Sequence, residues 1–135
     1  MSVGVRSLAE NLELIVELLH AAATAENLAQ GPGRRVAYRT TRHLLGGAVQ
    51  LGHTNAAIAA SLGASSNSIR LRSTVDGLIT AEDFAAVAGI PEAHILRWDQ
   101  AGLIRQEGPD IGGTYGYRAS ALLAAFLTPP HARHQ

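Results

Sequence analysis

A pattern of four residues occurs twice in this chain and limits its fold more than any other feature. Thr54, Ala59, Gly63 and Ile69 recur as Thr80, Ala85, Gly89 and Ile95. In each copy the threonine is a good helix N-cap, and the small alanine lets a second helix cross closely. The glycine tolerates the positive φ that ends the first helix, and the isoleucine anchors the second helix in the core. The repeat predicts two pairs of short helices, each joined by a tight turn.

The first pair, residues 54–72, has the spacing of a helix-turn-helix and resembles the type found in bacterial regulators. In that motif the second helix enters the major groove of DNA. Asn pairs with adenine and Arg with guanine in this groove. The residues expected to contact DNA are Thr54, Ser65, Ser66, Asn67, Arg70 and Arg72.

Charge is distributed unevenly, although the net charge of the chain is zero. Residues 27–75 contain six arginines and no acid, and residues 76–110 contain seven acids and two arginines. Four of the six arginines crowd the start of a predicted helix over residues 34–51. These are Arg34, Arg35, Arg39 and Arg42. A charge run is often only a solvated face, but its coincidence with the motif favours phosphate contacts.

The second pair belongs to a longer segment, residues 80–127. Its second helix contains Ile95, Arg97 and Trp98, and a glycine-rich stretch over residues 112–118 ends in Tyr117-Arg118. These features resemble the MerR and excisionase-like winged helices. The resemblance implies a short β-hairpin wing, a following helix over residues 119–127, and DNA contacts by Arg97 and Arg118.

The second unit departs from that family in its charge. Arg118 is the only basic residue of the wing, and Glu92 starts the second helix, where it would face the phosphates. This unit therefore either contacts DNA weakly or serves as a structural or protein-binding copy. Trp98, Tyr115 and Tyr117 are interpreted as packing aromatics.

The N-terminal segment predicts one amphipathic helix from Ser7 to about residue 30, with a Ser7–Glu10 capping box. Its apolar stripe either packs within the chain or forms a dimer seam through Leu12, Ile15 and Leu19. In the next helix, Gly46-Gly47 predicts either a break or a very close neighbour.

The sequence thus predicts a mainly α fold, with a long N-terminal helix and two tandem helix-turn-helix units, the second carrying a short β-hairpin wing. The expected divisions are residues 1–30 for packing or dimerisation, 34–79 for the first unit, 80–127 for the winged unit, and 128–135 as a disordered tail.

The chain offers few residues for other chemistry. It has no cysteine, no nucleophile-base pair, no metal-ligand spacing and no apolar run that could span a bilayer. We expect no enzymatic activity, cofactor or metal, and a cytoplasmic, nucleoid-associated location.

The expected function is sequence-specific binding of double-stranded DNA by a small bacterial or phage transcription regulator, as a homodimer. Two alternatives stay open. One is a DNA-packaging or architectural adaptor in a larger oligomer, and the other is a protein-binding adaptor that uses the acidic second unit.

Overall fold

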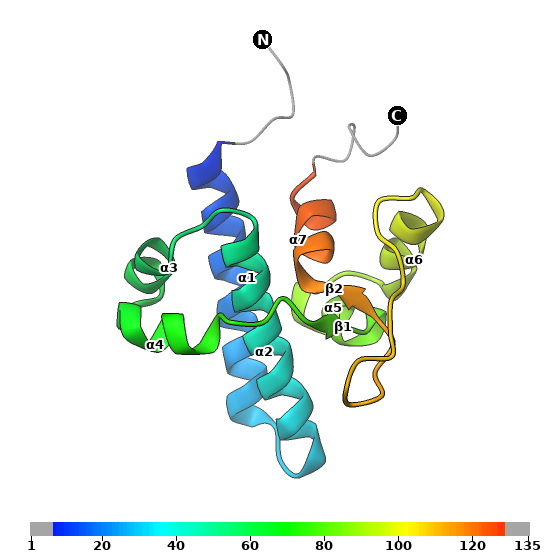
Figure 1. The fold of residues 1–135 in the computed structure, drawn as a ribbon, viewed down its shortest axis with the longest axis horizontal. Coiled ribbons are helices and arrows are strands. Elements are labelled where there is room, and N and C mark those ends of the chain that lie inside the picture. The colour runs from blue at the N-terminus through cyan, green and yellow to red at the C-terminus, as the bar shows by residue number, and fades with distance from the viewer. Residues whose placement is uncertain (1–6, 129–135) are drawn as a thin grey trace.

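The computed structural model describes residues 7–128 (Figure 1). This part of the chain is mainly helical, as predicted, with one small antiparallel sheet. The elements in chain order are α1 (Leu8–Leu28), α2 (Pro32–Gln50), α3 (Asn55–Leu62), α4 (Ser66–Arg72), β1 (Leu78–Ile79), α5 (Ala81–Ala88), α6 (Glu92–Gln100), β2 (Tyr117–Arg118) and α7 (Ala119–Leu127). The tail expected over residues 128–135 lies, except for Thr128, outside the described residues.

Helices α1 and α2 form a central antiparallel pair (Figure 1). The predicted capping box is present, since the Ser7 hydroxyl accepts from the Glu10 amide and the Glu10 carboxylate accepts from the Ser7 amide. Ile15 and Leu19 of the apolar stripe are almost completely buried within this chain. The structure therefore uses the stripe for internal packing, and the predicted dimer seam is not available on its surface.

The glycines of α2 mark two close approaches rather than a break. Helix α2 continues through Gly46-Gly47. A Cβ on Gly46 would overlap the carbonyl of Val75, and one on Gly47 would lie 2.8 Å from the Ser120 nitrogen. The linker after α4 and the start of α7 therefore cross α2 directly on its backbone. Helix α2 also begins two residues earlier than predicted, because Pro32 occupies its first turn.

The two repeated helix pairs lie on opposite sides of the α1–α2 pair in Figure 1. Their predicted caps and turns are confirmed. The Thr54 hydroxyl accepts from the Ala57 amide at 3.0 Å, and that of Thr80 accepts from the Asp83 amide at 3.1 Å. Gly63 and Gly89 both end the first helix with φ 69°. Helix α1 packs against α3 on one side and α5 on the other.

The predicted wing takes a different form. Strand β2 pairs with β1, in the register Ile79↔Tyr117, and not with a strand of its own hairpin. The two arms of the loop between α6 and β2 are joined by a bridge between Glu107 and Gly116, and by a hydrogen bond from the Asp110 amide to the Thr114 carbonyl at 2.9 Å. The repeated Gly-Leu-Ile segments also differ, because Leu78-Ile79 finds β2 as a partner whereas residues 102–104 form a turn.

An aromatic core supports the second unit. Phe84 makes edge-to-face contacts with Trp98 and Phe126, with ring centroids 6.3 and 6.1 Å apart. Trp98 and Tyr117 are buried, as expected for packing residues. Tyr115 is 56% exposed, and a carbon of its ring lies close to Gly108 in the same loop.

Helix α7 has the predicted bounds, but its N-terminus is capped from a distance. Asp76 in the linker accepts from the Ser120 amide at 2.8 Å and from the Ser120 hydroxyl at 2.5 Å. A carboxylate at this position satisfies an amide that the helix itself leaves free. The linker therefore connects α4 to the N-terminus of α7 as well as to β1.

Candidate nucleic-acid interface

Helix α4 is held by one face and exposed on the other. Ile69 is 3% exposed and packs into the core, whereas Ser66, Asn67 and Arg70 are exposed. Ser65 is the N-cap, and its hydroxyl accepts from the Ser68 amide at 3.0 Å. Thr54 has the same role on α3. The structure thus gives Ser65 and Thr54 capping functions and leaves Ser66, Asn67 and Arg70 as the outward polar set.

Asn67 and Arg70 form a single polar unit on α4. The Arg70 guanidinium donates to the Asn67 side-chain carbonyl at 2.5 Å. This bond leaves the Asn67 amide hydrogens and the other guanidinium hydrogens facing solvent. Such donors can reach acceptors on the major-groove edges of purines.

Arg72 and Arg42 meet at an aromatic ring that the sequence analysis did not identify. Their guanidinium carbons lie 5.5 and 5.6 Å from the centroid of the Tyr38 ring. The ring quadrupole favours cations at this range. The contact connects the basic start of α2 to the end of α4, so part of the predicted basic block is brought together in space.

Arg72 is also paired within the chain. Its guanidinium lies 3.4 Å from the Glu26 carboxylate at the end of α1. Both side chains are partly buried, so Glu26 offsets much of the positive charge of Arg72. We therefore assign Arg72 a positioning role beside Tyr38.

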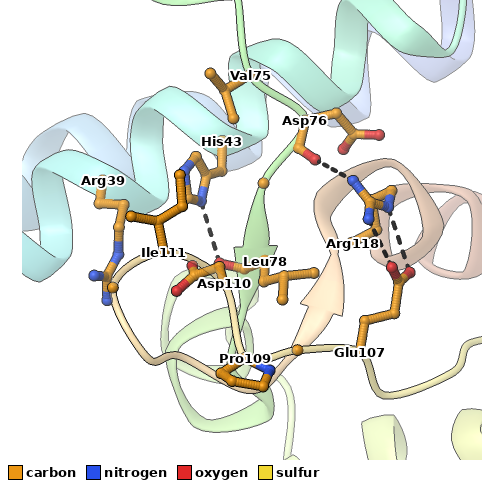
Figure 2. Close-up of a pocket in the computed structure, with 13 residues that line it drawn as sticks. Arg39, His43, Val75, Asp76, Leu78, Glu107, Pro109, Asp110, Ile111 and Arg118 are labelled. Carbon is orange, nitrogen blue, oxygen red and sulfur yellow. Dashed lines mark hydrogen bonds and ion pairs between the residues drawn. The ribbon is translucent and has the colours of Figure 1, made fainter.

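The other arginines of α2 diverge. Arg34 and Arg35 are exposed in its first turn, and their side chains make no hydrogen bond or ion pair within the described residues. Arg39 follows Arg35 by one helical turn, yet it lines an open depression together with His43, on the side of the second unit (Figure 2). The four arginines that were predicted to contact phosphates from the start of α2 are therefore not all brought to one place.

The second unit presents a different surface. Glu92 and Arg97 are both exposed on α6. Arg118 donates to the Glu107 carboxylate at 2.6 and 3.3 Å and to the Asp76 carbonyl at 2.9 Å (Figure 2). The hydrogen bond from Arg118 lowers the pKa of Glu107, and the same bond raises the pKa of Arg118. The wing arginine is thus engaged by an internal carboxylate.

Other site types find little support in residues 7–128. These residues contain no cluster of three or more His, Asp or Glu side chains that could hold a metal ion. None of the helices in this part of the chain combines the length and the apolar character that crossing a bilayer requires.

Comparison with protein-family models, with curated proteins and with solved structures finds no match to this chain.

Two residues of the interface escaped the sequence analysis for different reasons. Tyr38 lies four residues before Arg42 on α2, so helical spacing alone could have identified this contact. Glu26 and Arg72 are 46 residues apart, and no local pattern signals their ion pair. Only the packing of α4 near the end of α1 reveals it.

Proposed function

We propose that this protein binds double-stranded DNA sequence-specifically, with α3 and α4 acting as a helix-turn-helix and α4 entering the major groove. The observation that carries the proposal is the exposed Asn67–Arg70 pair on α4, within a segment of six arginines and no acid. These two side chain types make the common bidentate contacts to adenine and guanine. The buried face of α4 keeps them directed outward.

Phosphate contacts are assigned to three arginines that have no carboxylate partner among the described residues: Arg34, Arg35 and Arg42. Arg42 is held over Tyr38, next to α4. Phosphate contacts fix the register of a protein on the duplex, and base contacts then read the sequence. Arg39 and Arg118 are left out of this set because one lines the depression and the other is paired with Glu107.

The experiment is a salt titration of binding to a labelled duplex. Each neutralised phosphate contributes about −0.9 to the slope of log affinity against log salt, so three contacts give about −2.7 per protomer. Arg42→Ala should make the slope about 0.9 less negative. Arg105→Ala, which changes an exposed arginine outside the interface, is the matched control and should leave it unchanged. A slope near zero for the unmodified chain would contradict DNA binding.

The second unit is proposed as a winged scaffold related to the MerR and excisionase-like type, with Arg97 as a minor phosphate contact. A role as a small bacterial or phage transcription regulator, acting as a homodimer in the nucleoid, follows from the same motif. Because Ile15 and Leu19 are used in the core, a dimer would form through a surface other than the α1 stripe.

One observation favours a second function, a protein-binding adaptor. Helix α6 exposes Leu96 one turn after Glu92, and the turn after the helix exposes Leu103; the two leucines are 44% and 41% exposed. Apolar side chains beside an acid suit a basic, partly apolar protein surface better than a phosphate backbone. The mass of the protein in solution separates these roles from DNA packaging, which predicts a ring of many subunits.

A further inference from the structure

An open depression lies between α2, the linker before β1 and the loop before β2 (Figure 2). Its volume is about 560 Å³, within the roughly 300–1,000 Å³ of sites that bind small molecules. No residue of α4 lines it, and so none of the residues assigned to base contacts does. The depression is therefore a feature that DNA recognition does not explain.

Two oppositely charged side chains in the depression, those of Arg39 and Asp110, have no ion-pair partner among the described residues. The Arg39 guanidinium has no hydrogen bond or ion pair among the described residues. Asp110 accepts from the Thr114 amide with Oδ1 at 2.9 Å, which leaves Oδ2 unengaged. The remaining charges, on Asp76, Glu107 and Arg118, already have partners in one another or in Ser120. An arginine and a carboxylate oxygen that are both available to a ligand thus line one small depression.

His43, which lines the same depression, adds a fixed acceptor. Its Nδ1 lies 3.2 Å from the Leu78 carbonyl, which can only accept, so Nδ1 carries the hydrogen of the neutral ring. Burial lowers the pKa of His43, despite the opposing effect of that hydrogen bond; Arg39 and Arg42 lower it further, and Asp110 raises it. The ring is therefore neutral at pH 7, with Nε2 as an acceptor. Gly77 packs on the ring so closely that a side chain there would overlap it.

The walls of the depression are apolar and exposed. Ile111 at the loop tip is fully exposed, and Val75 on the linker is 50% exposed. Figure 2 shows both side chains beside His43, with Arg39 and Asp110 on the same side of the depression. Burial of these side chains by a ligand would gain about 25 cal/mol for each Å² removed from water.

We propose that this depression binds a small zwitterion of the α-amino acid class with an apolar side chain. The carboxylate pairs with Arg39, whose planar fork suits two parallel hydrogen bonds. The ammonium group donates to Asp110 Oδ2 and His43 Nε2, and the apolar side chain packs between Val75 and Ile111. A phosphate monoester fits less well, because it would bring about two negative charges next to three carboxylates.

Isothermal titration calorimetry on the full chain tests this site without DNA, so its outcome does not depend on the proposed function. The probes are L-leucine and L-phenylalanine, which contain all three features. Three further probes lack one each: 3-phenylpropanoate lacks the ammonium group, phenethylamine the carboxylate, and glycine the side chain. We expect the two amino acids to bind, and each incomplete probe to bind at least about tenfold more weakly.

Substitutions then locate the site. Arg39→Leu and Asp110→Asn should each weaken L-phenylalanine binding by about tenfold or more, and Arg105→Leu should not change it. Methyl NMR of the unmodified chain should show the Ile111 signals shift on titration, which needs no variant to fold. Absence of binding by both amino acids overturns the proposal. Binding that both variants leave intact also overturns it. Preferential binding of guanosine 5′-monophosphate, which serves as the phosphate-monoester probe, does so as well.

Discussion

The two repeated helix pairs share the same cap, turn and anchor residues and have different surfaces. In both, a threonine caps the first helix, a glycine with φ 69° ends it, and an isoleucine buries the second helix. On the outside, α4 presents Asn67 and Arg70, whereas α6 presents Glu92 beside Arg97. The capping, turn and core residues that form the motif are therefore shared, whereas the exposed residues that determine what its surface can bind are different.

The elements that pack around the two helix pairs also differ. The α3–α4 pair has no aromatic residue and gains its basic neighbours from α2 through Tyr38. The α5–α6 pair has an aromatic core, a two-stranded sheet and α7 behind it, and its arginine at the wing is paired with Glu107. The first pair therefore presents the exposed polar side chains of α4, whereas the second is built around internal packing.

The largest expected effect is on the scaffold that both pairs share. Leu19 is 2% exposed on α1, and Leu19→Glu places a charge in that core. We expect a loss of several kcal/mol in the free energy of unfolding, because a buried charge without a partner is costly. Both pairs should lose structure together in urea, followed by circular dichroism.

Leu8→Glu, at a position that is 62% exposed, is the matched control and should change stability little. A Leu19→Glu chain that stays folded, becomes monomeric and binds DNA weakly would instead show that α1 is a dimer seam.

The two threonine caps offer a direct comparison of stability. Thr54→Ala and Thr80→Ala each remove one hydrogen bond to a helix amide, and each should cost about 1 kcal/mol of unfolding free energy. Thr54→Ala should also weaken DNA binding, because α3 supports α4, whereas Thr80→Ala should not. Chemical denaturation and DNA titration measure the two effects. Equal losses of DNA affinity would show that both pairs take part in binding.

A smaller effect on the free energy of unfolding is expected at alkaline pH, and it comes from Tyr117 in the second unit. Burial, then the hydrogen bond to Asp99, raises the pKa of Tyr117 from 10 to about 12. A raised pKa in the folded state means that the unfolded chain loses this proton first, so the associated stability is present below about pH 10 and lost as pH rises toward 12. Tyr117→Phe should remove this part of the pH dependence. Ultraviolet absorbance of the phenolate follows the ionisation of Tyr117. If the stability of Tyr117→Phe depended on alkaline pH in the same way as that of the unmodified chain, the role given to Tyr117 would be contradicted.

Local features of the fold could be predicted from the sequence, because caps, turns and helix bounds depend on neighbouring residues. The Ser7 capping box, the turns at Gly63 and Gly89, and the bounds of α7 are confirmed for that reason. The contacts that join distant segments were missed. Asp76 caps α7 from 44 residues away, and the pairing of β1 with β2 replaces the expected hairpin.

In the candidate site, too, local features could be predicted and contacts between distant segments could not. The outward polar residues of α4 follow from helical spacing around the buried Ile69, so the sequence could identify them. The pairing of Arg118 with Glu107 and the placement of Arg39 in the depression depend on the loop over residues 107–112, whose path no local pattern specifies. For this reason two of the predicted arginine contacts are reassigned here.

The most direct test compares the two second helices as readers of sequence. A binding site is first selected from random duplexes with the unmodified chain, and Arg70→Ala and Arg97→Ala are then titrated against this site and a scrambled duplex. Arg70→Ala should lose about 1–3 kcal/mol of discrimination between them, whereas Arg97→Ala should keep it and lose only some overall affinity. If Arg97→Ala abolishes discrimination while Arg70→Ala preserves it, the account is contradicted, and α6 is the reading helix.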